Sequence, residues 1–174
     1  MELKLKFVNK IKYADIKLNG LTVIAGPNSS GKSTLSRSLA IRENMLVIDP
    51  DQLSAEGLSP IAAGKAAVQM ARLFLSKGIS FVRESTLTAH FDFTLMAEAK
   101  QKGYTVELVY IRLASPQLAL KRIAARVARG GHDVPVPDVL RRFKRSLENL
   151  PKAIELADRV TILDNSTGKY TRLS

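Results

Sequence analysis

One stretch near the amino terminus decides the fold, and it reads Gly26-Pro27-Asn28-Ser29-Ser30-Gly31-Lys32-Ser33-Thr34. It matches the phosphate-binding pattern G-x-x-x-x-G-K-[ST] without a departure. The two glycines allow the backbone to wrap around a phosphate, so that successive N–H groups point inward. An apolar run at 21–25 precedes the motif and a helical pattern follows it, which is the context that a phosphate-binding loop requires. We therefore expect residues 26–34 to bind the phosphates of a nucleotide.

Two side chains of this loop have predicted chemical roles. Lys32 would place a positive charge on the β- and γ-phosphates, which makes it a candidate catalytic residue. The hydroxyl group of Ser33 would coordinate Mg²⁺ as the metal ligand. The motif thus predicts ATP and Mg²⁺ as cofactors.

The rest of the chain alternates between strand-like and helix-like patterns. Apolar, β-branched runs predict strands at 21–25, 45–48, 79–82, 106–111 and 160–163. Helical periodicity lies between them, at 32–41, 59–77, 88–102, 115–129 and 137–149. This alternation predicts one α/β P-loop NTPase domain over residues 1–174, with a five-stranded parallel sheet covered by helices on both faces.

Residues 1–20 break this rhythm. Polar and apolar residues alternate strictly from Glu2 to Phe7, and Ile11, Tyr13 and Ile16 follow at near-strand spacing. The pattern predicts an N-terminal antiparallel β-hairpin that leads into the first strand of the sheet.

Composition limits the classes of function. The 174 residues suit one domain, and no apolar run approaches the roughly 20 residues that a membrane span needs. The absence of cysteine excludes disulfides, thiolate catalysis and cysteine-based zinc sites. A net charge of +11 favours an anionic partner, such as a nucleotide, a sugar nucleotide or nucleic acid. We expect a cytoplasmic enzyme.

Acidic residues follow two of the predicted strands. Asp49 and Asp51 come after the second strand, and Glu84 comes after the third. The carboxyl ends of parallel strands meet at the ligand-binding edge of such a sheet. One of these carboxylates could therefore accept the proton of an attacking hydroxyl group, although Asp49 suits a helix cap equally well.

Arginines gather on the two helical stretches within 115–149. Arg122, Arg126 and Arg129 line one face of the first stretch, and Arg141 and Arg142 lie on the second. A loop rich in glycine and proline joins the two, so we predict a helical lid that brings guanidinium groups onto phosphate. His132 in that loop could contact phosphate, act as a hinge, or form a structural hydrogen bond.

Several classes of P-loop protein are compatible with these features. The chain lacks the Leu-Ser-Gly-Gly signature of transporter-type ATPases and the Asn-Lys-x-Asp motif of GTPases. Strand-end carboxylates and lid arginines favour a small-molecule kinase. An ATPase module that works through a partner and a nucleic-acid end kinase stay open as alternatives, but aromatic residues at 6% argue against a base-stacking platform, which makes a nucleic-acid partner the weaker interpretation.

The chain also resembles a known family, the zeta-toxin-like P-loop kinases, and in particular their small single-domain bacterial members. The resemblance runs from Gly26 to Asn165. It includes the P-loop and the segments Asp49-Pro50-Asp51, Glu84-Ser85-Thr86-Leu87, Gly130-Gly131-His132-Asp133-Val134-Pro135, Arg141-Arg142 and Asp164-Asn165-Ser166.

This resemblance implies transfer of the γ-phosphoryl group of ATP to a hydroxyl group, which in the toxins belongs to UDP-N-acetylglucosamine, and an antitoxin-like protein partner. It implies that Asp51 is the catalytic base, and that Arg126 and either Arg141 or Arg142 clamp the phosphates. Glu84 and Thr86 would contact the acceptor, with Asp49 and His132 nearby as further candidates. The toxins read Glu-Gly-Thr where this chain has Glu84-Ser85-Thr86, so the acceptor could differ.

Overall fold

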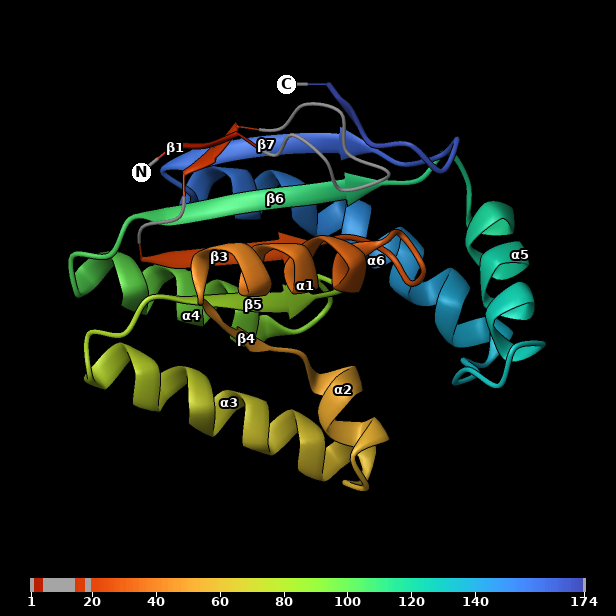
Figure 1. Cartoon of the computed structure of the whole chain (residues 1–174), viewed down its shortest axis with the longest axis horizontal. Helices are drawn as coiled ribbons and strands as arrows, with labels where there is room; N and C mark the ends of the chain where they lie inside the picture. The colour runs from red at the N-terminus through yellow and green to blue at the C-terminus, as the bar shows by residue number, and fades with distance from the viewer. Residues whose placement is uncertain (1, 5–14, 18–19, 174) are drawn as a thin grey trace.

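The computed structural model describes residues 2–4, 15–17 and 20–173, and most of these build one sheet with helices on both faces (Figure 1). The sheet has six strands in the order β4-β5-β3-β6-β7-β8. The first five in that order are parallel, and β8 is antiparallel to β7. The strands in chain order are β3 (Leu21–Ala25), β4 (Leu46–Ile48), β5 (Phe81–Ser85), β6 (Val106–Arg112), β7 (Arg159–Asp164) and β8 (Thr171–Arg172).

The predicted α/β fold with five parallel strands is thus confirmed, and β8 is an addition that the sequence patterns did not indicate. Near the amino terminus, β1 (Glu2–Lys4) pairs antiparallel with β2 (Asp15–Lys17) in a separate two-stranded sheet. This pairing is the one that the alternation at 2–7 and Ile16 predicts. The turn of that hairpin lies outside the described residues.

Six helices are present in the described part of the chain. Proline follows an N-capping side chain at the start of three of them: Asp49 accepts a hydrogen bond from the backbone N–H of Asp51, Ser59 from that of Ala62, and Ser115 from that of Leu118. The helices are α1 (Lys32–Glu43), α2 (Pro50–Ala55), α3 (Pro60–Ser76), α4 (His90–Gln101), α5 (Pro116–Val127) and α6 (Val136–Leu156).

Two of these helices differ from the sequence prediction. The short helix α2 is absent from the predicted helical stretches, but the helix-cap alternative for Asp49 is confirmed, because Asp49 caps the first turn of α2 with a 2.9 Å hydrogen bond. Helix α6 continues to Leu156 rather than ending at 149, and it contains Pro151.

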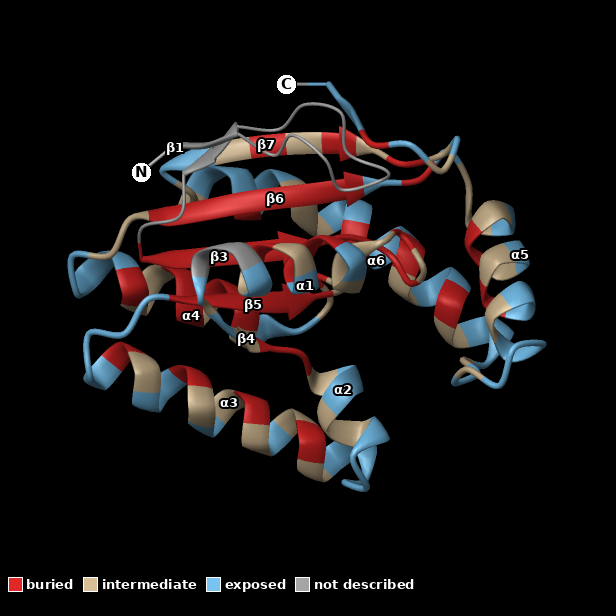
Figure 2. Cartoon of the chain, viewed as in Figure 1, coloured by how far each residue is buried: buried red, intermediate tan, exposed pale blue. Residues whose placement is uncertain are grey.

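The sheet separates two apolar layers, because successive strand side chains point to opposite faces. On one face, Ile24, Val82 and Val109 pack against Leu35 and Leu39 of α1. On the other face, α3, α4 and α6 cover a larger cluster that includes Phe81, Leu95 and Met96. Figure 2 shows the central strands buried throughout their length. Each fully buried leucine contributes roughly 1.5–3 kcal/mol to this core.

The carboxyl ends of the parallel strands define the end of the molecule where a site can form. In Figure 1 the strand arrowheads, the loop after β3, α2 and α5 all lie at that end. Helices α5 and α6 are joined there by a small cluster of their own, which contains Ile123, Val139 and Phe143. Within the described residues, no helix combines the length and the apolar character that crossing a membrane requires.

Candidate active site

The loop 26–31 connects β3 to α1 and has the geometry of a phosphate-binding loop. Gly26 and Gly31 have φ angles of 149° and 103°, in the region that favours glycine. A Cβ atom on Gly26 would lie 2.3 Å from the carbonyl oxygen of Ile111, and one on Gly31 would lie 2.3 Å from the hydroxyl oxygen of Tyr170. Both glycines are therefore required by close packing as well as by backbone torsion.

The turn after β7 holds this loop from outside. The Asn165 side chain donates to the carbonyl oxygen of Ser30 at 2.8 Å, and the Tyr170 hydroxyl donates to that of Gly31 at 2.7 Å. Arg122 donates to the carbonyl oxygens of Asn165 and Ser29, at 2.6 and 3.4 Å. Arg122, expected at phosphate, thus bonds to loop backbone in this structure. Sequence reasoning missed the role of Tyr170, because nothing nearby in the chain links it to the loop.

Lys32 begins α1 and turns back over the loop. Its ammonium group donates to the carbonyl oxygens of Gly26 and Pro27, at 3.0 and 2.9 Å. Burial lowers the pKa of Lys32, and the negative charges of Glu84 and Asp51 oppose that shift. The carboxylates therefore help to keep this lysine charged, as its predicted role requires.

Ser33 lies between the loop and two strand-end carboxylates. Its hydroxyl group donates to Oε2 of Glu84 at 2.9 Å and reaches Oδ2 of Asp49 at 3.5 Å. The other oxygen of Glu84 accepts a hydrogen bond from Ser36. Burial raises the pKa of Glu84, and nearby Asp49 adds to that shift, whereas the serine hydroxyl groups and Lys32 oppose it. Asp49 serves two purposes, since its other oxygen caps α2.

These three side chains form an oxygen-rich donor set that fits Mg²⁺. Mg²⁺ is commonly bound by one or two carboxylates, with water and substrate phosphates completing the coordination. Ser33 would hold the ion, with Asp49 and Glu84 as its carboxylate partners. The described residues contain no group of three or more His, Asp or Glu side chains arranged as an all-protein metal site.

Asp51 occupies a different position from the other two carboxylates. It lies in the first turn of α2, is exposed, and lines the same cavity as Lys32. Its backbone N–H is used by the α2 cap, whereas no side-chain hydrogen bond joins its carboxylate to another described residue. Its carboxylate is therefore available to a molecule in the cavity.

The lid arginines differ in what their side chains contact. Arg126 is half-buried on α5, close enough to Lys32 to lower the lysine pKa, and its Nε atom has no hydrogen-bond acceptor among the described residues. Arg129, in the turn after α5, instead donates to the carbonyl oxygen of Ala125 at 2.9 Å. Arg141, paired with Asp138 at 2.7 Å, lines the cavity together with neighbouring Arg142.

The remaining predicted acceptor residues lie at different depths. Thr86 lines the cavity and shares a 2.9 Å hydrogen bond with the hydroxyl group of Thr88. His132 is exposed in the loop between α5 and α6, and it does not line the cavity. Thr86 thus joins the site directly, whereas His132 does not in this conformation.

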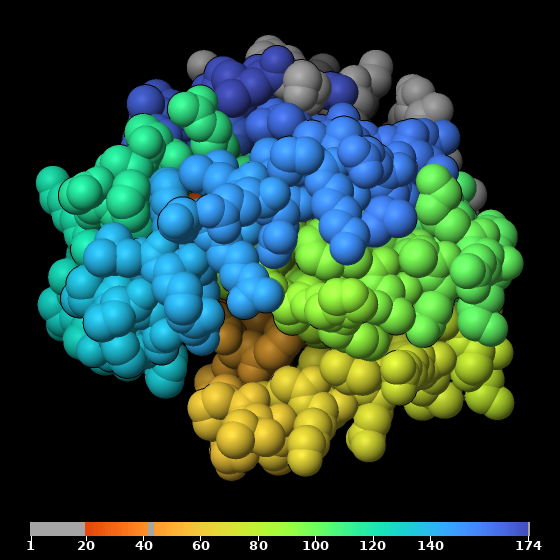
Figure 3. Space-filling model, turned by 180° about the vertical axis from the view of Figure 1, so that it is seen from behind, coloured from red at the N-terminus to blue at the C-terminus, as the bar shows by residue number. Residues whose placement is uncertain are grey.

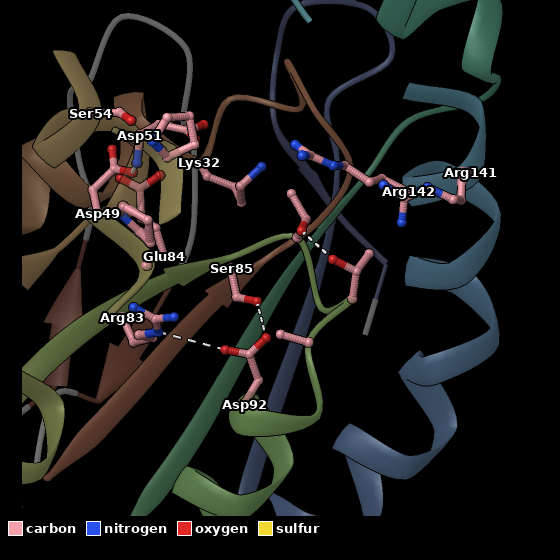
Figure 4. Close-up of a pocket in the computed structure, with 16 residues that line it drawn as sticks. Lys32, Asp49, Asp51, Ser54, Arg83, Glu84, Ser85, Asp92, Arg141 and Arg142 are labelled. Atoms are coloured by element: carbon pink, nitrogen blue, oxygen red, sulfur yellow. Dashed lines mark hydrogen bonds and ion pairs between the residues drawn. The ribbon is translucent and has the colours of Figure 1, made fainter. Parts of the chain in front are cut away.

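One cavity of about 340 Å³ unites these elements (Figure 4). It extends from the phosphate-binding loop across the strand ends to α2 and to the start of α6. Figure 3 shows the surface hollowed between the light-blue α6 and the yellow α3. Its lining residues include Lys32, Asp49, Asp51, Arg83, Glu84, Thr86, Arg141 and Arg142.

The parallel sheet, the loop geometry and the strand-end carboxylates define an α/β P-loop domain with a kinase-like fold. The chain belongs to the family described as an AAA domain (AAA_33), whose family model matches residues 21–150. An uncharacterized protein of Haemophilus influenzae is 36% identical over 124 residues, which cover 68% of this chain and 88% of that relative.

Solved structures share the fold at low sequence identity. A chain of the PezAT chromosomal toxin-antitoxin system of Streptococcus pneumoniae superposes with a TM-score of 0.66 at 17% identity, covering 92% of this chain and 73% of that one. For a candidate kinase of Chloroflexus aurantiacus the TM-score is 0.63 at 21% identity, with coverage of 87% and 91%. For a gluconokinase of Sinorhizobium meliloti it is 0.52 at 17% identity, with coverage of 86% and 84%. These likenesses extend to the fold alone.

Proposed function

We propose that this protein is an ATP- and Mg²⁺-dependent kinase that transfers the γ-phosphoryl group of ATP to a hydroxyl group of a small anionic acceptor. The observation that carries the proposal is that Lys32 and Asp51 line one cavity of about 340 Å³. A phosphate-binding lysine and an available carboxylate in one pocket are what direct phosphoryl transfer requires.

Each group then has a defined task. Asp51 takes the proton of the acceptor hydroxyl group while the oxygen of that hydroxyl group forms a bond to the γ-phosphorus. The bond from the γ-phosphorus to the β,γ-bridging oxygen breaks in the same displacement, and ADP leaves. Lys32, Arg126 and Arg142 place fixed positive charge around the transferred group, where it stabilises the transition state most. Bound Mg²⁺ would supply charge neutralisation between the β- and γ-phosphates.

The division among the carboxylates supports Asp51 as the base. Both oxygens of Glu84 accept hydrogen bonds from serines of the loop and α1, and Asp49 caps α2 while reaching Ser33. In this proposal Asp49 and Glu84 bind Mg²⁺ together with Ser33, and Thr86 contacts the acceptor. The remaining predicted phosphate ligands, Arg122, Arg129 and His132, would join only through movement of the lid.

Two finer features of the proposal come from the resemblance to zeta toxins. A UDP-sugar is one anionic acceptor that the proposal includes, and an antitoxin-like protein is the protein partner that it includes. The fold likeness to a chain of a toxin-antitoxin system supports testing both.

The experiment is a transfer assay with γ-labelled ATP, Mg²⁺ and an acceptor panel. The panel contains gluconate, glucose 6-phosphate, glucose, UDP-N-acetylglucosamine and an oligonucleotide with a free 5′-hydroxyl group. Label on a small anionic acceptor supports the proposal. Label released only as free phosphate would favour an ATPase module, and label on the oligonucleotide would favour an end kinase; either result replaces the proposal.

A further inference from the structure

Arg83 is a charged residue of the cavity that takes no part in the proposed phosphoryl transfer. Arg83 lies on β5 directly before Glu84, so the two side chains leave the strand on opposite faces. Arg83 is only 6% exposed, yet it lines the cavity. A buried guanidinium group inside a sheet strand is rare and needs a physical explanation.

The surroundings hold this guanidinium group in place from two sides. Its Nε atom lies 3.6 Å from Oδ1 of Asp92, which is 2% exposed on α4, and its Cζ atom lies 5.6 Å from the centre of the Phe91 ring. Asp92 is itself held by Ser85, whose hydroxyl group donates to Oδ2 at 2.5 Å. Figure 4 shows the Arg83–Asp92 and Ser85–Asp92 contacts meeting at the Asp92 carboxylate.

These contacts leave hydrogen-bond donors of Arg83 without acceptors. Its Nη1 atom is buried without an acceptor among the described residues, and its Nε atom faces Asp92 alone. The separation of 3.6 Å from Asp92 is an ion-pair distance, longer than a hydrogen bond. Guanidinium presents five N–H donors in a rigid fork, and buried donors are nearly always paired. The free part of this fork therefore suits an anion that enters the cavity.

We propose that Arg83 binds an anionic group of the acceptor, either a carboxylate or a phosphate, and so selects a hydroxylated anion as the substrate. Calling the bound molecule the acceptor rests on the proposed kinase function, whereas anion binding by Arg83 does not. The cavity of about 340 Å³ lies within the range of small-molecule ligand pockets, about 300–1,000 Å³.

Arg83 differs from the lid arginines in what it can recognise. Arg141 is exposed and already paired with Asp138, and Arg142 lies next to it on α6. Arg83 is fixed in the central sheet, where desolvated donors left unpaired penalise a neutral analogue strongly. Arg83 therefore discriminates between acceptors, and the lid arginines serve the transferred phosphoryl group.

A binding experiment tests the anion site without requiring turnover. The protein is first saturated with Mg²⁺ and a non-hydrolysable ATP analogue to fill the phosphate-binding loop, and inorganic phosphate is then titrated by calorimetry. The test variant is Arg83→Met combined with Asp92→Asn, which avoids leaving Asp92 as a buried unpaired charge. The matched control is Arg72→Met, because Arg72 stacks on the same Phe91 ring at 5.9 Å but does not line the cavity.

We expect wild type and the Arg72 variant to bind phosphate alike, and the double variant to bind it about ten- to a hundredfold more weakly. Absence of phosphate binding in wild type, or equal binding in the double variant, would overturn the anion site. Failure of the ATP analogue to bind would instead overturn the proposed function. The difference in phosphate binding between wild type and the double variant would still test anion binding by Arg83.

A kinetic experiment identifies the anion. Gluconate, glucose 6-phosphate and glucose present a carboxylate, a phosphate and no charge on similar carbon skeletons. Arg83→Lys keeps the positive charge but loses the planar set of N–H donors of the guanidinium group. We expect this variant to raise KM about tenfold for the preferred anionic acceptor. Preference for glucose, or an unchanged KM with an acceptor that is turned over, would refute selection by Arg83 while leaving the kinase assignment intact.

Discussion

Ser33 in the phosphate-binding loop donates a 2.9 Å hydrogen bond to Oε2 of Glu84, a residue of strand β5 that lies 51 positions further along the chain. This contact joins the loop expected to hold the nucleotide to the strand end where the carboxylates gather. Because a second oxygen of Glu84 accepts from Ser36, the glutamate is oriented from two sides. The relationship makes Glu84 a candidate determinant of metal binding.

Glu84→Gln should weaken Mg²⁺ binding, since the amide keeps the shape but loses the negative charge. We expect the Mg²⁺ concentration for half-maximal phosphoryl transfer to rise about tenfold. The measurement is a Mg²⁺ titration of activity at saturating ATP. Glu56→Gln, a change at an exposed residue, serves as the control. An equal Mg²⁺ requirement in both variants would show that Glu84 does not take part in Mg²⁺ binding.

Asp51→Asn should abolish most transfer while nucleotide affinity is kept. A positioned general base contributes about 10²–10⁴-fold, and the amide cannot accept the proton. Asp51 is exposed at the start of α2, so the change should cost little stability. Turnover and ATP affinity are measured separately, and undiminished turnover would contradict the assignment of the base.

Arg126→Gln should lower kcat by about 10²–10³-fold, because a fixed cation near Lys32 would be lost from the transition state. Lys121→Gln, an exposed cation on the same helix, is the matched control. Steady-state kinetics of both variants provide the comparison. Equal effects would mean that general charge on α5, rather than Arg126, matters.

Tyr170→Phe should raise the KM for ATP, because the hydroxyl group holds the carbonyl oxygen of Gly31. Loss of this hydrogen bond should also cost about 1 kcal/mol of unfolding free energy. Tyr104→Phe is the control: its hydroxyl group bonds to the carbonyl oxygens of Phe74 and Ile79, away from the phosphate-binding loop. Thermal unfolding should respond to both changes, whereas the KM for ATP should respond only to the first.

Asp158→Asn should lower stability in a pH-dependent manner. The backbone N–H of Val106 and the Lys100 side chain hold the pKa of Asp158 below its usual value. A lowered folded-state pKa stabilises above the unfolded pKa, and this stabilisation is lost as the pH falls through the folded value. With a side chain 38% exposed and screened by solvent, we expect about 1–3 °C in Tm near neutral pH.

The Tm difference between wild type and Asp158→Asn should shrink to zero in acid, since both side chains are then neutral. Glu148→Gln, an exposed change on α6, should shift Tm little at any pH. Thermal melts across the acid range decide the matter. A difference that persists below the lowered pKa would show that the charge of Asp158 is not its cause.

Some features of the structure were not predicted from the sequence. Asp49 followed by Pro50 has the same capping pattern as Ser59-Pro60 and Ser115-Pro116, so α2 carried a readable signal. Strand β8 spans only Thr171–Arg172 and has too few residues to show a period. Arg83 gave no usable signal, because an arginine within a short apolar run resembles an ordinary solvent-facing position.

By itself, the sequence determined the phosphate-binding loop, the alternation of strands and helices, and the end of the sheet where carboxylates and arginines collect. Those features depend on local backbone torsions, capping and periodicity, which are set by residues close together in the chain. Only the tertiary structure decided that Glu84 turns to Ser33, that Arg122 and Tyr170 hold the loop from outside, and that Arg83 reaches the cavity. These contacts join residues far apart in the chain, and which ones meet depends on the packing of the whole sheet.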